Sequence, residues 1–144
     1  MPKKSDPEDV KWSGYASAPD PADFRKWFDA ALIDPDRLLF SAVCDDEIVG
    51  YCHFRRSGDI FEPSYGTAAV YRKRGIAGVA LMGGIAAIRS DFPGATIHCW
   101  IAESNLASQR SVSKKGFVKT HQTKDQEFKH PVRVETMRLW LARP

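Results

Sequence analysis

Residues 65–78 contain the residue types that an anion-binding site requires. Three consecutive basic residues, Arg72, Lys73 and Arg74, stand directly before Gly75 and an apolar stretch with helical spacing. The first turn of a helix leaves backbone N–H groups without partners and carries part of a positive charge. Small residues at a helix start let an anion approach the backbone closely. The segment therefore predicts a pyrophosphate site, although a solvated basic loop explains the three cations equally well.

The composition excludes several other functions. A chain of 144 residues with 43% hydrophobic and 27% charged residues is typical of one globular domain. The net charge of +3 is mild, and the basic clusters lack the interleaved aromatic residues of a nucleic-acid platform. The three cysteines form no Cys-x-x-Cys pair and the four histidines show no metal-ligand spacing, so we expect free thiols and no metal.

The chain also lacks the apolar stretches that membranes and secretion require. Its longest nearly uncharged run, 75–88, is shorter than the roughly 20 residues that span a bilayer. The first residues are polar, without the apolar core of a signal peptide. We therefore expect a cytoplasmic protein with no membrane partner.

Local signals predict the elements that position these residues. Asp20-Pro21 is typical of a helix start, Asp45-Asp46 of a hairpin turn, and Gly116 of a helix end. Pro63 predicts a bend or bulge inside a strand, and a polar loop is expected at 122–131. Residues 1–9 are expected to form a loose tail, and residues 10–144 a single mixed α/β domain with a weak first strand at 10–16. The further expected helices are 20–32, 75–89 and 105–115, and the strands are 38–44, 47–55, 60–67, 95–101, 117–123 and 132–141.

Two motifs resemble the signatures of one enzyme superfamily. Residues 72–77, Arg-Lys-Arg-Gly-Ile-Ala, fit the pattern Arg/Gln-x-x-Gly-x-Gly/Ala. Asn105 and the later Gly116-Phe117 fit a second pattern, in which an asparagine precedes a helix that ends at Gly-Phe. One expected helix and one expected strand separate the two motifs. Over roughly residues 36–142 the chain thus resembles the GNAT superfamily of N-acetyltransferases.

The resemblance implies a fold and a cofactor. It implies a single domain with a central, mixed but mostly antiparallel sheet of about six to seven strands, splayed at a bulge and flanked by helices. It also implies that acetyl-CoA lies with its pyrophosphate at the basic segment and its pantetheine arm along the strand that ends near Thr67. Asn105 would contact the arm, cap its helix, or do both. The implied cofactor-binding residues are Gly66, Thr67, Arg72, Lys73, Arg74, Gly75, Ile76, Ala77, Gly78 and Asn105.

The catalytic groups are less well defined. Many GNAT relatives have a proton-donating tyrosine seven residues after the asparagine, where this chain has Val112. Glu62, on the strand that leads to the cofactor, is the candidate general base, and its alternative is a solvated carboxylate at a strand end. His53, His98 and Glu103 are weaker candidates.

The resemblance implies transfer of an acetyl group from acetyl-CoA to an amine of a small molecule or peptide, by direct attack in a ternary complex. The alternative is a GNAT-like module that binds an acyl-CoA without turning it over, as a sensor or a partner-binding domain. The chain is compatible with a homodimer, and we expect no nucleic-acid partner. Four aromatic residues could line the acceptor pocket or belong to the core: Trp12, Trp27, Phe61 and Phe128.

Overall fold

The computed structural model describes Trp12, residues 20–67 and residues 69–144. The expected tail at 1–9 lies outside these residues, as does the expected strand at 10–16 apart from Trp12. The described chain runs from one helix through three consecutive strands and then through two helices and three further strands, so the expected helices all form. The elements are α2 (Pro21–Ile33), β1 (Arg37–Cys44), β2 (Glu47–Ser57), β3 (Ile60–Thr67), the 3₁₀ turn η2 (Ala69–Tyr71), α3 (Ile76–Asp91), β4 (Thr96–Ala102), α4 (Leu106–Lys114), β5 (Phe117–Lys129) and β6 (Val132–Ala142).

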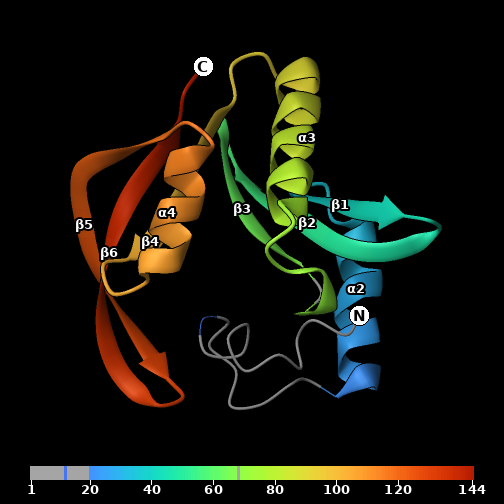
Figure 1. Cartoon of the computed structure of the whole chain (residues 1–144), viewed down its shortest axis with the longest axis horizontal. Coiled ribbons are helices and arrows are strands. Elements are labelled where there is room, and N and C mark those ends of the chain that lie inside the picture. Colours follow the sequence, from blue (N-terminus) through green and yellow to red (C-terminus); the bar gives the residue numbers. More distant parts are fainter. Residues whose placement is uncertain (1–11, 13–19, 68) are drawn as a thin grey trace.

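The strands form one six-stranded sheet in the order β1-β2-β3-β4-β6-β5 (Figure 1). All neighbouring strands are antiparallel except β3 and β4, which are parallel. These two strands pair only at Ile60 with Thr96 and at Phe61 with Ile97, and then diverge. The mixed, mostly antiparallel sheet that splays beside the basic segment is therefore confirmed.

The bulge expected at Pro63 does not form. The β2–β3 register runs without a shift, and Pro63 pairs with Phe54. Proline has no N–H to donate to a neighbouring strand. Pro63 comes after the two residues at which β3 pairs with β4. At this point β3 has only β2 as a paired neighbour, so a residue without an N–H group breaks no pairing with β4.

The loop expected at 122–131 is mostly strand. β5 continues to Lys129 and pairs with β6 down to Val132, so the two strands form a long hairpin that turns at His130 and Pro131. Most β5 side chains between residues 119 and 127 are exposed, which removes the alternating apolar pattern that marks a strand in a sequence. Backbone pairing with β6, interrupted between Lys119 and Thr123, holds this strand in the sheet.

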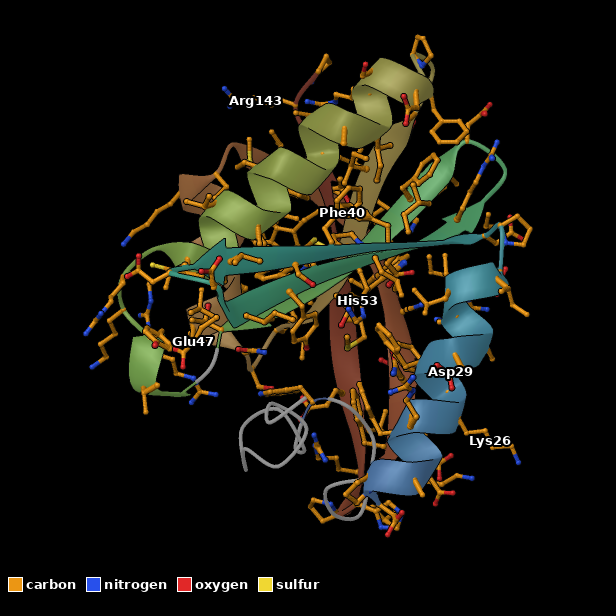
Figure 2. The ribbon with its side chains drawn as sticks, turned by 90° about the vertical axis from the view of Figure 1, so that its right-hand side faces the viewer. Lys26, Asp29, Phe40, Glu47, His53 and Arg143 are labelled. Carbon is orange, nitrogen blue, oxygen red and sulfur yellow. The ribbon has the colours of Figure 1, made fainter. Side chains whose placement is uncertain are left out.

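Helices α2 and α3 cover opposite faces of β1–β3 (Figure 2). On one face, the Trp27 ring of α2 stacks on His53 of β2 with a centroid separation of 5.8 Å. On the other face, Phe54 is buried beneath α3 with Phe40 edge-on to it at 5.8 Å. A single hydrophobic cluster joins α3, α4 and the side chains of β2, β3 and β4 that face them. No helix within the described ranges is long and apolar enough to cross a membrane.

Candidate active site

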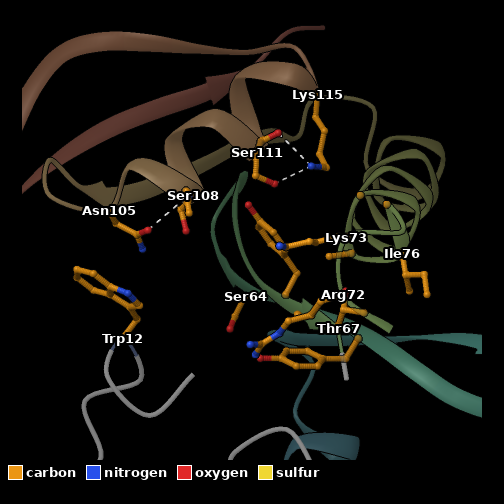
Figure 3. A pocket seen from close by; sticks show the side chains of 17 residues that line it. Trp12, Ser64, Thr67, Arg72, Lys73, Ile76, Asn105, Ser108, Ser111 and Lys115 are labelled. Atoms are coloured by element: carbon orange, nitrogen blue, oxygen red, sulfur yellow. Dashed lines mark hydrogen bonds between the residues drawn. The ribbon is translucent and has the colours of Figure 1, made fainter. Parts of the chain in front are cut away.

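A cavity of about 510 Å³ opens where β3 parts from β4, bounded by the starts of α3 and α4 (Figure 3). Every predicted cofactor residue except Arg74 lines it. The Arg74 guanidinium lies instead 5.7 Å from the centre of the Tyr71 ring, and the Tyr71 hydroxyl donates a hydrogen bond to Glu47. The cavity therefore brings together the two sequence motifs, which are far apart in the chain.

The N-terminus of α3 differs from those of α2 and α4. Asp20 and Asn105 cap α2 and α4, because their side chains accept hydrogen bonds from the Ala22 and Ser108 N–H groups. The residue at the start of α3 is Gly75, which has φ +75° and makes no side-chain cap. The first turn of α3 thus presents backbone N–H donors to the cavity without a capping side chain.

The cavity also contains residues that sequence reasoning did not select. They come from β2, β3 and α4, and only the fold brings them to the basic segment. Among the described residues that line the cavity there are three cationic side chains, Arg72, Lys73 and Lys115, and no carboxylate. The described lining therefore carries a net positive charge, which suits an anionic ligand. The residues not selected from the sequence are Tyr51, Ser64, Tyr65, Ala107, Ser108, Ser111 and Lys115, together with Trp12, which was considered for the acceptor side.

Tyr65 lies on the wall between this cavity and a second one. Its ring packs against the main hydrophobic cluster, and burial raises the pKa of its hydroxyl above the usual value, with Cys99 raising it further and a hydrogen bond with Ser111 lowering it. Burial also raises the pKa of the Cys52 and Cys99 thiols to about 12. These thiols therefore stay protonated at neutral pH and are poor nucleophiles.

The second cavity, of about 310 Å³, lies between the diverging strands and the β5–β6 hairpin. It shares part of its wall with the first cavity, including Ser64, Tyr65 and Asn105. Aromatic and apolar side chains such as Trp100 and Phe128 form most of the remaining wall. Glu62 supplies the one carboxylate among its described lining residues.

Glu62 faces His98 across the gap between β3 and β4. Its Oε2 atom lies 3.9 Å from Nε2 of His98, and its side chain is 45% exposed. Burial lowers the pKa of His98, while Glu62 raises it and Lys124 lowers it further. The carboxylate is thus accessible from the second cavity and has a mostly neutral imidazole beside it at pH 7.

Of the weaker candidates for a base, His98 lies beside Glu62 and the other two lie elsewhere. Glu103 forms ion pairs with Arg138 and with Lys119, whose Nζ atom is 3.8 Å away. His53 packs between the Trp27 and Tyr51 rings. Neither Glu103 nor His53 lines either cavity.

The four aromatic residues divide between the cavities and the packing. Trp12 and Phe128 line the second cavity, with their rings edge-on at 6.1 Å. Trp27 stacks on His53 at the α2 face of the sheet. Phe61 is fully buried in the main hydrophobic cluster, so it belongs to the core.

Comparison with protein families gives a match over residues 3–118 to the acetyltransferase (GNAT) domain. The chain belongs to the GNAT acetyltransferase family. It is therefore an enzyme of the N-acetyltransferase class, as the paired motifs predicted. A comparison with curated proteins gives no significant match.

Solved GNAT structures share the fold at low sequence identity. A ribosomal-protein-alanine N-acetyltransferase from Brucella melitensis has 19% identity and a TM-score of 0.75, over 90% of this chain and 82% of that one. A spermidine N-acetyltransferase from Vibrio cholerae, in complex with CoA and spermine, has 12% identity and a TM-score of 0.76, over 96% and 85%. An N-acetyltransferase from Staphylococcus aureus Mu50 has 18% identity and a TM-score of 0.72, over 89% and 81%.

GNAT enzymes use acetyl-CoA, and the first cavity fits its phosphate end. An ideal Cβ atom on Gly75 would meet no atom within 4 Å, so the space next to the first turn of α3 is open. The positive side chains and uncapped N–H groups around this space match a pyrophosphate in charge and in hydrogen-bonding sense. Val112, at the position of the tyrosine that many relatives have, is fully buried and contributes nothing to either cavity.

Proposed function

We propose that this GNAT domain transfers the acetyl group of acetyl-CoA to an amine in a ternary complex. The observation that carries the proposal is the division of charge between two adjoining cavities. The described lining of the first cavity has cations and no carboxylate, and that of the second has one carboxylate, Glu62, among aromatic walls. An anionic cofactor and a cationic amine are thus drawn to opposite sides of one shared wall.

At the phosphate end, the chain supplies both charge and hydrogen-bond donors. Arg72 and Lys73 lie beside the uncapped first turn of α3, and Lys73 has φ +65°, next but one to Gly75 at +75°. Successive left-handed and right-handed residues turn their N–H groups toward one concave surface, which suits a phosphate.

At the shared wall, the divergence of β3 and β4 leaves strand edges that can bind an extended ligand. Beyond Phe61 and Ile97 the two strands no longer pair. A pantetheine arm in this gap can accept and donate backbone hydrogen bonds as an added strand would. The Asn105 Oδ1 atom caps α4, so its side-chain amide N–H₂ group is the part that would contact the arm.

At the acceptor side, Glu62 is the proposed general base. An amine is mostly protonated at pH 7 and must lose a proton to attack. Glu62 would accept that proton directly or through one water, and the aromatic walls of the second cavity would favour the ammonium form on arrival. When bound, acetyl-CoA supplies the activated acetyl group. As the new N–C bond forms and the C–S bond breaks, the departing thiolate needs a proton. The buried Val112 side chain has no proton to donate, so solvent takes this role.

The acceptor is proposed to be an amine of a small molecule or a peptide. The free thiols of Cys44, Cys52 and Cys99 agree with a reducing compartment, and we include a cytoplasmic location in the proposal.

The test combines binding and turnover. Acetyl-CoA at 100 times its Kd should stabilise the fold by about 2.7 kcal/mol, measured as a rise in Tm. Release of free CoA thiol is then followed with a panel of primary amines. Stabilisation together with amine-dependent thiol release supports the transferase. Stabilisation with no thiol release across the panel supports the non-catalytic acyl-CoA module, and no stabilisation rejects the cofactor.

A further inference from the structure

Lys115 reaches from the end of α4 across to the first turns of α3 (Figure 3). Its Nζ atom donates hydrogen bonds to the backbone oxygen of Ser111 at 3.0 Å and to the Ser111 hydroxyl at 2.7 Å. Ser111 is one turn earlier in the helix, so the lysine folds back along α4 and its side chain enters the cavity. The ammonium group is thereby held at a defined place in the cavity wall.

Gly78 makes room for this lysine. An ideal Cβ atom on Gly78 would lie 2.5 Å from Cε and 3.3 Å from Nζ of Lys115. No real Cβ contact is that short, so any other residue at this position would displace the lysine. Gly78 at the start of α3 thus leaves the space that the Lys115 side chain from the end of α4 occupies.

The surroundings of Lys115 favour binding of an anion beside its ammonium group. Burial and the neighbouring Lys114 lower its pKa, because both disfavour the positive charge. In the described part of the chain, no carboxylate forms an ion pair with Lys115 and none lines its cavity. Two of the three ammonium N–H donors go to Ser111, which leaves one for a ligand.

We propose that Lys115 is a further cofactor ligand that binds a phosphate group of CoA, and that Gly78 is required for it to reach that phosphate. The inference rests on the proposed use of acetyl-CoA. The ligand chemistry is a phosphate, which the pyrophosphate or the 3′-phosphate of CoA can supply. Lys115 thus adds a cation from α4 to those that the basic segment contributes from the α3 side.

The experiment measures Kd by calorimetry for CoA, dephospho-CoA and pantetheine. The variants are Lys115→Met, Gly78→Ala, the double variant and Lys114→Met, which removes the adjacent exposed cation outside the cavity. Lys115→Met should weaken CoA binding about 10- to 100-fold, the worth of a charged hydrogen bond. It should leave pantetheine binding unchanged, because pantetheine has no phosphate. Lys114→Met should change CoA binding much less.

The coupling between the two residues provides the sharper readout. Gly78→Ala should also weaken CoA binding, while the double variant should bind no more weakly than Lys115→Met alone. Alanine favours a helix, so Gly78→Ala should not lower the Tm of the free protein. A loss that persists with dephospho-CoA assigns the pyrophosphate, and a loss that disappears assigns the 3′-phosphate.

Two results overturn the inference without touching the proposed function. One is unchanged CoA binding in Lys115→Met; the other is an equal loss for CoA and pantetheine, which would indicate a structural role for the lysine. If the unmodified protein binds neither CoA nor pantetheine, the proposed function fails and the inference fails with it.

Discussion

Gly84 of α3 lies directly against the ring of Phe54 on β2. An ideal Cβ atom on Gly84 would be 2.7 Å from Cε2 of Phe54 and 3.3 Å from the Phe40 ring. Phe54 is fully buried in the main hydrophobic cluster. The preceding Gly83 has nothing within 4 Å of the same position. A methyl group at Gly84 would therefore clash with the sheet, whereas a methyl group at the adjacent Gly83 would meet open space.

Gly84→Ala should destabilise the fold by about 1–3 kcal/mol, because the added methyl overpacks the helix against the sheet. Gly83→Ala should stabilise it by about 0.5–1 kcal/mol through the helix preference of alanine. Urea unfolding of both variants measures the difference. Equal effects of the two substitutions would contradict this packing.

Gly75→Glu should abolish CoA binding, because the new side chain places a negative charge in the open space at the start of α3. The residue has φ +75°, so any L-amino acid there should also lower the free energy of unfolding by roughly 1–2 kcal/mol. Gly75→Ala is the matched control, since it carries the same backbone strain without the charge. Calorimetric Kd values for the two variants separate strain from blockage. A Glu variant that binds CoA as well as the Ala variant would place the phosphates elsewhere.

Glu62→Gln should lower kcat by roughly 10²–10⁴, the usual contribution of a general base, and should hardly change the Kd for CoA. Glu127→Gln removes an exposed β5 carboxylate outside both cavities and serves as the control. Steady-state kinetics with the best amine from the panel, measured from pH 6 to 9, provides the comparison. A Glu62→Gln enzyme with unchanged kcat across this range would favour a site that selects and positions the neutral amine.

His98 should make the fold less stable in mild acid. Its folded pKa lies below the ordinary value of 6.5, so the folded state disfavours the protonated ring. The contribution of the neutral His98 ring to the free energy of unfolding is therefore fully present above about pH 6.5, and it is lost as the pH falls through the folded pKa. Urea unfolding between pH 7.5 and 5 should show this loss in the natural protein and a weaker one in His98→Gln.

Glu62→Gln provides a second arm of the pH experiment. Because Glu62 raises the pKa of His98, its removal should depress that pKa further and increase the loss of stability in acid. A loss in Glu62→Gln that is no larger than in the natural protein would show that Glu62 does not stabilise the protonated His98 ring.

Local chemistry was sufficient to predict much of this fold. Asp20, Asn105 and Gly116 act at helix ends through their own side chain or backbone, so their roles can be recognised within a few residues of sequence. The basic segment was recognised for the same reason. Its strand, loop and helix are consecutive, and the structure brings all but Arg74 of its selected residues to one cavity.

The features that sequence reasoning missed depend on contacts between distant segments. Residues 123–129 form a strand because β6 pairs with them, although their own side chains are almost all polar and exposed. Lys115 enters the cavity because Gly78, on another helix, leaves space for it. Glu62 meets His98 because β3 and β4 are neighbours across a parallel joint. No local sequence pattern predicts these three contacts.

Because β3 and β4 pair over so short a length, the sheet consists of two three-stranded parts, here called leaves. Strands β1–β3 form one leaf and β4–β6 the other, and among the described residues of the sheet only the pairs at Ile60–Thr96 and Phe61–Ile97 connect them. A ligand that forms hydrogen bonds with both exposed edges takes the place of a missing strand. Part of its binding free energy then holds the leaves together. Backbone amides on both leaves, including those far from the ligand, should exchange with solvent more slowly in the complex.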